Sequence, residues 1–264
     1  MVLEPQLSRI AKYGPLTPEE VAAFEAMAGP AKRYARGQVI RYRGDPRPDV
    51  YVLLCGWLAC SVTFDDGRRQ IVKIHLPGDL VGVPSFAASV ASETVHALSD
   101  AVVAPIALTE FGHLFRNHPR LAAILFLACQ EERVILMQRL AWASRTRAIR
   151  RVAELILSLH DRVRVSQPDL RAAMFAPLSQ EEIGDATGLT VVTVNQSLRE
   201  LRRLRIASWN RFELEILDRG RLEELVGRYR ETTRDMNWFD EPRLPDPGVP
   251  AQTGPAREAG SPSG

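Results

Sequence analysis

Hydrophobic and polar positions divide the chain into a strand-rich part followed by a helix-rich part. From residue 36 to about residue 106, short apolar runs such as 49–55 and 70–76 alternate with glycine-containing turns. The sequence Asp65-Asp66-Gly67-Arg68 lies between two such runs and predicts a hairpin turn. Many short strands joined by glycine turns are typical of a small antiparallel barrel or jelly roll.

A short helix is predicted ahead of these strands. Thr17 is a capping residue, Pro18 follows at the first helical position, and two acidic residues occupy the first turn. Apolar residues then recur at helical spacing until Gly29-Pro30, where we expect the helix to end.

A long helix is predicted after the strands, because no Gly or Pro interrupts residues 120–144 and apolar residues recur near one face. At ~1.5 Å per residue it is on the order of 37 Å long. A long helix with a narrow apolar seam usually packs along a partner helix, so we expect a dimer seam. Packing against the chain's own barrel is the alternative. The expected seam residues are Leu121, Leu125, Ala128, Ile135 and Trp142.

Beyond this helix the pattern predicts a second helix over residues 145–161, from apolar residues at i, i+3 and i+4. The polar segment 162–176 is interpreted as a loop, and a short amphipathic helix is expected over 219–230. From residue 241 to residue 264, 10 of 24 residues are Pro or Gly. We therefore expect residues 231–264 to form a disordered tail.

The stretch 178–204 has the local signals of two helices joined by a tight turn. Ser179 followed by Glu182 is a capping box, which predicts a helix start. Gly188 readily takes the left-handed conformation that ends such a helix, and Thr190 can cap the next one. This is the helix-turn-helix pattern, in which a helix is followed by a glycine-containing turn and then by a longer helix. An ordinary helical hairpin is the alternative.

A predicted wing after these helices favours DNA as the partner. Residues 206–209 and 212–217 predict two strands around a tight turn. In a helix-turn-helix the second helix presents its N-terminal residues to the major groove. Asn and Gln can pair bidentately with adenine, and an aliphatic side chain can contact a thymine methyl. The residues expected to contact DNA are Ser179, Gln180, Thr190, Val191, Val192, Thr193, Asn195, Gln196 and Arg199.

Composition and charge are consistent with a folded protein that contacts phosphate. Of 264 residues, 45% are hydrophobic and 25% are charged, which excludes a largely disordered or fibrous chain, and the length suggests two domains. The net charge of +2 is unevenly distributed, since residues 145–221 carry 14 arginines against 10 acidic residues. Such an arginine excess suits phosphate contacts. A solvated arginine-rich surface would have the same composition.

Membrane segments, metal centres and active sites are not predicted. The longest apolar run has nine residues, about half of the roughly 20 that a membrane helix needs. The N-terminus lacks the features of a signal peptide, so we expect a cytoplasmic location. Without metal-ligand spacing, a nucleophile constellation or a phosphate loop, we expect no enzyme, no metal and no cofactor. Cys55 and Cys60 are expected to be core thiols. Cys129 is interpreted in the same way, with an inter-subunit disulfide as its alternative.

The ordered set of motifs resembles the CRP/FNR family of bacterial transcription regulators over roughly residues 15–230. The matching features are Gly37-Gln-Val-Ile40, Gly44-Asp45, Tyr51 before Gly56, Asp66-Gly67-Arg68, Pro77-Gly78-Asp79 with Gly82, the long helix, and Gln180 to Thr190 with its wing.

The resemblance implies a two-domain α+β protein. Its parts are a cyclic-nucleotide-binding-type antiparallel jelly-roll barrel (1–118), a dimerisation helix (119–144), a winged helix-turn-helix (145–218), a terminal helix (219–230) and the tail. It also implies a homodimer on a pseudo-palindromic site in double-stranded DNA, and leaves contact with RNA polymerase open.

The chain departs from the family at the positions where the resemblance places ligands. In cyclic-nucleotide-responsive members a Gly-Glu pair follows the Pro-Gly-Asp turn, and an Arg-Ser pair holds the cyclic phosphate. The corresponding residues here are Gly82, Val83, Glu93 and Thr94. A carboxylate in place of the phosphate's cationic partner would repel the ligand, so we expect no response to cyclic AMP. The iron–sulfur cluster of oxygen-sensing members is not expected either, because no cysteine precedes Cys55.

The function expected from these features is that of a sequence-specific, dimeric transcription regulator. Many family members carry Glu and Arg where this chain has Val192 and Gln196, so we expect a different half-site, with A·T pairs favoured at the Asn195 and Gln196 positions. The alternative is a ligand-sensing signalling module whose C-terminal domain binds protein rather than DNA. The sequence leaves open the effector, the target genes and the sign of regulation.

Overall fold

Two four-stranded antiparallel sheets form the first part of the fold, with strand orders β1-β8-β3-β6 and β2-β7-β4-β5. The computed structural model describes residues 4–46, 50–143, 146–170, 173–227 and 239. The strands are β1 (Lys32–Tyr34), β2 (Val39–Arg41), β3 (Val50–Cys55), β4 (Leu58–Thr63), β5 (Arg69–His75), β6 (Leu80–Val81), β7 (Thr94–Ala97) and β8 (Ala101–Ile106). The predicted antiparallel barrel is confirmed.

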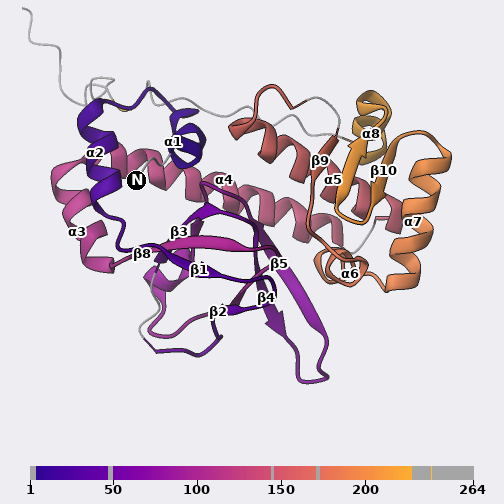
Figure 1. Cartoon of the computed structure of the whole chain (residues 1–264), viewed down its shortest axis with the longest axis horizontal. Coiled ribbons are helices and arrows are strands. Elements are labelled where there is room, and N and C mark those ends of the chain that lie inside the picture. Colours follow the sequence, from indigo (N-terminus) through magenta and orange to yellow (C-terminus); the bar gives the residue numbers. More distant parts are fainter. Residues whose placement is uncertain (1–3, 47–49, 144–145, 171–172, 228–238, 240–264) are drawn as a thin grey trace, which may run out of the picture.

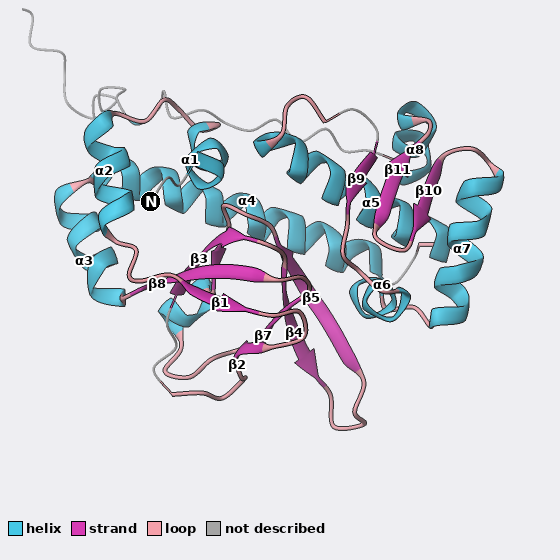
Figure 2. Ribbon diagram, viewed as in Figure 1, coloured by secondary structure: helices cyan, strands magenta, loops and turns pink. Residues whose placement is uncertain are grey.

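The hairpin between β4 and β5 is the longest in the barrel and lies on the side of the C-terminal helices (Figure 2). Its strands pair from Leu58 opposite His75 to Thr63 opposite Arg69. Gly67 takes a left-handed φ of 81° in the connecting turn, a conformation that glycine adopts without steric cost. The turn predicted at residues 65–68 is confirmed.

Three helices gather at one end of the long helix α4 (Figure 1). They are α1 (Glu4–Ala11), α2 (Pro18–Ala26) and α3 (Leu108–Asn117), and α4 itself spans Pro119–Ala143. The helix predicted after Thr17 is confirmed as α2, and its start is a capping box in which Thr17 and Glu20 bond each other's backbone N–H. Helix α1 was not predicted from the sequence.

The long helix is confirmed, but part of its expected seam faces the chain's own barrel. Leu121 and Leu125 are only 0% and 5% exposed and pack in the core beneath α1 and α3. For these two residues the alternative interpretation therefore holds, because no partner helix can reach them. Ala128 packs at the edge of the same core and Ile135 is half-buried. The side chain of Trp142 lies outside the described residues.

A different face of α4 exposes several apolar side chains, with exposed Arg133 among them. Phe126, Val134 and Met137 are 58%, 46% and 60% exposed, and neighbouring Leu136 is also exposed. Phe126, Val134 and Met137 recur at i, i+8 and i+11, which places them in one stripe along the helix. We call these three residues the α4 stripe.

The C-terminal part packs four helices around a three-stranded sheet of order β10-β11-β9. Its elements are α5 (Ala148–Ser166), β9 (Ala173–Phe175), α6 (Gln180–Thr187), α7 (Val191–Arg203), β10 (Ala207–Asn210), β11 (Glu213–Ile216) and α8 (Arg219–Val226). The interpretation of residues 162–176 as a loop was wrong, because α5 continues to Ser166 and β9 pairs with β11.

The end of the described chain bears on two further predictions. The helix expected over 219–230 ends at Val226, and Gly227 follows with a left-handed φ of 63°. The predicted tail lies outside the described residues, apart from Phe239, which packs against the core that contains Leu121. No helix in the described ranges is long and apolar enough to cross a membrane.

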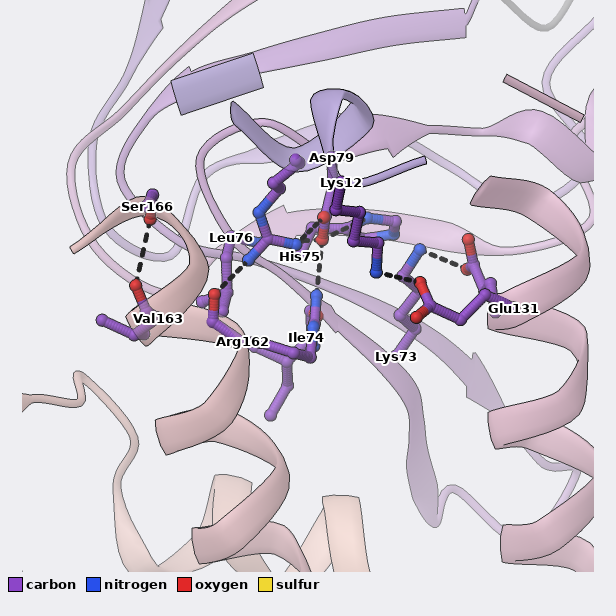
Figure 3. A network of polar contacts seen from close by, with 12 residues as sticks. Lys12, Lys73, Ile74, His75, Leu76, Asp79, Glu131, Arg162, Val163 and Ser166 are labelled. Carbon is purple, nitrogen blue, oxygen red and sulfur yellow. Dashed lines mark hydrogen bonds and ion pairs between the residues drawn. The ribbon is translucent and has the colours of Figure 1, made fainter. Parts of the chain in front are cut away.

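A buried carboxylate joins the barrel to α1 and α5 (Figure 3). The Asp79 side chain forms ion pairs with Arg9 and, at 2.6 Å, with Arg162 Nη2. It also accepts the N–H of Leu76 at 3.0 Å, while Arg162 Nη1 donates to the carbonyl of Ile74 at 2.8 Å. Burial alone would raise the pKa of Asp79, but the two guanidinium groups hold it well below its usual range. We call Asp79, Arg9 and Arg162 the Asp79 cluster.

A second set of contacts holds α6 against the β4–β5 hairpin. Arg69 Nε lies 2.7 Å from Asp185 Oδ2, and the Gln70 side chain donates to the Asp185 carbonyl at 2.5 Å. Arg36 reaches Glu182 at 2.9 Å from the loop before β2. The C-terminal part is thus docked on the barrel through both α5 and α6.

Candidate nucleic-acid interface

Two capped helix starts define the interface. The Ser179 hydroxyl accepts the Glu182 N–H at 3.1 Å, and the Glu182 carboxylate accepts the Ser179 N–H at 2.6 Å. Gly188 ends α6 with a left-handed φ of 65°. The Thr190 hydroxyl then accepts the Thr193 N–H at 3.2 Å at the start of α7. The predicted capping box, turn and second cap are confirmed.

The crossing of α6 and α7 is close because residue 184 has no side chain. A Cβ at Gly184 would lie 2.6 Å from the Leu189 carbonyl oxygen, well inside van der Waals contact. Val194 and Leu201 fill the inner face of α7 and are buried. The helix pair is therefore closely packed, with the outer face of α7 turned away from the core.

The outer face of α7 carries apolar, amide and cationic groups in one line. Val192, Gln196 and Arg199 are all exposed and recur at i, i+4 and i+7. Val192 is 66% exposed and adjacent Val191 is 42% exposed. Two exposed valines at a helix start are poorly suited to water and well suited to an apolar surface such as a thymine methyl.

The remaining predicted contact residues have local partners. The Ser179, Thr190 and Thr193 hydroxyls take part in the helix caps. Asn195 Nδ2 donates to Gln180 Oε1 at 2.7 Å and to the Val191 carbonyl at 3.1 Å. Eight of the nine predicted residues lie at the start of α6 or within the first two turns of α7, and Arg199 follows in the third turn of α7.

The arginine excess has two different uses. Arg151 Nη1 donates to the Thr187 carbonyl at 3.0 Å and thereby caps the end of α6, and Arg162 belongs to the Asp79 cluster. These arginines stabilise the fold. Arg199 and Arg203 are exposed along the outer face of α7 and are available to phosphate.

Arg211 is exposed in the turn between β10 and β11 and was not among the residues predicted to contact DNA. An arginine at the tip of the predicted wing is the signal that could have identified it.

The barrel positions that the resemblance assigns to a cyclic phosphate hold an internal ion pair. Glu93 Oε1 lies 2.6 Å from Arg41 Nη2, and these side chains are only 8% and 3% exposed. The Thr94 hydroxyl accepts the Arg43 N–H at 3.1 Å. Gly82 is buried with a φ of 86°, and Val83 is half-buried.

The cysteines differ from one another. Cys60 is buried with its Sγ 3.1 Å from His75 Nε2, and burial raises the pKa of the thiol, as expected of a core residue. Cys55 is exposed, so its interpretation as a core thiol was wrong. A bulge between Leu53 and Cys55 shifts the alternation of the strand at its end. Cys129 is half-buried.

Within the described ranges no three His, Cys, Asp or Glu residues are grouped so as to hold a metal.

Comparison with known proteins finds both parts of the chain in established families. The family model for a cyclic nucleotide-binding domain matches residues 31–118, and that for a Crp-like helix-turn-helix domain matches residues 150–225. The transcriptional regulatory protein btr of Bordetella pertussis is 27% identical over 79% of this chain and 86% of its own length. The transcriptional activator protein anr of Pseudomonas aeruginosa is 27% identical over 80% of this chain and 86% of its own length.

Solved structures share this fold. FixK2 from Bradyrhizobium japonicum has a TM-score of 0.68 and 25% identity, covering 76% of this chain and 98% of that one. A CRP-family transcriptional regulator from Thermus thermophilus has a TM-score of 0.58 and 26% identity, covering 76% of this chain and 98% of the other.

Proposed function

This chain belongs to the CRP/FNR family of transcription regulators, and we propose that it binds a pseudo-palindromic DNA site as a homodimer without requiring cyclic AMP. The observation that carries the DNA assignment is the exposed outer face of α7, with two bare valines beside an amide and an arginine. The proposal gives the chain a binding role and no catalysed reaction.

DNA binding is supported by the fit of α7 to the major groove. Val192 and Gln196 lie in the first half of the helix, where a recognition helix meets base edges. Arg199 and Arg203 follow toward its end, where exposed cations can contact the phosphates beside the groove. The wing adds Arg211 as a third cation on the exposed surface.

Dimerisation is supported by the α4 stripe. An exposed apolar row on a long helix is costly in water, and a second copy of the same helix would cover it. A two-fold dimer would present two copies of α7 to two half-sites about one helical turn of DNA apart. Contact with RNA polymerase would follow from promoter binding and is part of the proposal.

Independence from cyclic AMP is supported by the Arg41–Glu93 ion pair. Arg41 already has an anionic partner inside the barrel, so a cyclic phosphate would have to displace Glu93 or lie beside it. Displacing it would leave a buried carboxylate without its counter-charge, which is strongly unfavourable. Control of this regulator would then depend on another ligand or on its abundance.

The half-site is first identified by selecting bound sequences from a random pool of double-stranded DNA. Fluorescence anisotropy on duplexes that carry one or two copies of this half-site then tests the proposal. The inverted pair should bind at least about 100-fold tighter than the single half-site. Met137→Glu places a charge in the α4 stripe and should abolish this difference, whereas Val72→Glu, at the exposed position of β5, is the matched control and should retain it. Equal affinity for scrambled DNA would contradict the proposal and favour a protein partner for the C-terminal domain.

A further inference from the structure

The side chains of Gln180 and Asn195 form one hydrogen-bonded unit at the exposed side of the helix pair. Asn195 Nδ2 donates to Gln180 Oε1 at 2.7 Å, across the gap between the first residue of α6 and the second turn of α7. The same nitrogen donates to the Val191 carbonyl at 3.1 Å. A carboxamide nitrogen has two hydrogens, so both Asn195 donors are used within the protein.

The orientation of the Asn195 amide follows from the Val191 carbonyl. A main-chain carbonyl can only accept, so the Asn195 nitrogen must face it and the Asn195 oxygen must point elsewhere. Rotating the amide by half a turn would bring Oδ1 against two acceptors, the Val191 carbonyl and Gln180 Oε1. Asn195 therefore presents an acceptor, and no spare donor, to a ligand.

We propose that Gln180 is a specificity-determining positioning residue, which locks Asn195 as an acceptor that selects an amino-bearing base. This inference rests on the proposed DNA binding. In the major groove, adenine N6 and cytosine N4 are donors, whereas guanine O6 and thymine O4 are acceptors. Asn195 Oδ1 accepts from adenine or cytosine and repels the keto oxygen of guanine or thymine.

This inference changes the base preference expected at the Asn195 position. A bidentate contact to adenine needs one amide N–H and one amide oxygen from the same side chain. The free oxygen is available, but the N–H is committed to Gln180. The preference at this position is therefore for A or C rather than for A·T pairs in either orientation.

The position that faces Asn195 is identified as the one at which Asn195→Ala makes the affinities for the four bases equal. The test is the relative affinity of each protein for the four bases at this position, measured on duplexes that carry the selected site. The wild type should disfavour G and T about tenfold relative to A and C. Gln180→Ala frees one Asn195 N–H to donate to a keto oxygen, so the G and T penalty should shrink to within about threefold.

Gln180→Glu is the conservative variant that separates positioning from simple contact. Its carboxylate still accepts from Asn195 Nδ2, so the base preference should persist while affinity falls on every sequence, because of the added negative charge near DNA. In an Asn195→Ala background, Gln180→Ala should change the preference no further.

Two results would overturn the inference while leaving DNA binding intact. The first is a Gln180→Ala variant that keeps the wild-type penalty for G and T. The second is an Asn195→Ala variant that changes no base position. A wild-type protein without sequence preference would instead contradict the proposed function itself, and the inference with it.

Discussion

Replacing Asp79 by alanine should strongly destabilise the protein, because it removes the carboxylate that two partly buried arginines share. The side chains of Arg9 and Arg162 are 13% and 21% exposed, and that of Asp79 is 9% exposed. Removing one partner of a buried ion pair costs about 3–5 kcal/mol, against about 0–1 kcal/mol for an exposed pair. We therefore expect Asp79→Ala to lower the free energy of unfolding by about 3–5 kcal/mol.

Urea unfolding followed by circular dichroism at pH 7 measures this loss. For a chain of this size, about 3–5 kcal/mol corresponds to a fall in Tm of roughly 6–20 °C. Arg68→Ala is the matched control, because its ion pair with Asp66 is on the exposed hairpin turn and its side chain is 83% exposed. The control should leave the unfolding curve unchanged.

A second substitution tests the cause of the loss. In the Asp79→Ala background, Arg162→Met removes one of the uncompensated charges and should restore part of the stability. Because the folded pKa of Asp79 is depressed, its stabilisation is present above about pH 4 and disappears as the pH falls further. A loss below about 1 kcal/mol at pH 7 would show that water reaches both arginines, and would refute the account of the Asp79 cluster.

Three further predictions concern the barrel and the helix-turn-helix. Burial lowers the pKa of His75 to about 4, so between about pH 6.5 and pH 4 only the unfolded chain takes up this proton. The free energy of unfolding should thus fall by on the order of 3 kcal/mol over that range, and His75→Gln should show a correspondingly smaller pH slope in urea titrations. Gly184→Ala should cost about 1–3 kcal/mol in thermal unfolding, since its Cβ meets a carbonyl at 2.6 Å, whereas Gly112→Ala in α3 meets only a flexible arginine at 3.6 Å and should be neutral or stabilising. Gln196→Ala should relax one base position and leave the salt dependence of DNA binding nearly unchanged; equal loss on all sequences would contradict direct readout.

The helix-turn-helix was predictable because its signals are local. The capping box of Ser179 and Glu182, the glycine at 188 and the cap at Thr190 each act within four residues, and each was found where expected. The β4–β5 hairpin was predictable for the same reason. Local hydrogen bonding and backbone conformation determine these features, so the neighbouring residues specify them.

The seam on α4 was only partly predictable, because an apolar pattern does not say what covers it. Leu121 and Leu125 share a face that the barrel buries, whereas Phe126 and Met137 lie on the side left exposed. The sequence shows that both sets are apolar. Only the packing of α4 on the barrel distinguishes the buried face from the face that remains exposed.

The Asp79 cluster and the Gln180–Asn195 unit have no local signal. Asp79 lies 70 residues from Arg9 and 83 residues from Arg162 along the chain. Gln180 and Asn195 were each predicted to contact DNA, but their mutual hydrogen bond depends on the crossing of α6 and α7. These contacts follow from tertiary structure, which residue spacing alone does not determine.

Selection of bound sequences from a random pool of double-stranded DNA, with purified protein and no added ligand, tests the central claim most directly. A two-fold-symmetric motif, with half-sites about 10 base pairs apart, is the predicted result. It would establish sequence-specific binding by a dimer that needs no cyclic nucleotide. Enrichment of an unpaired half-site only, by a folded protein, would contradict the account, and so would enrichment of no sequence when the selection is repeated with cell extract to supply any missing ligand.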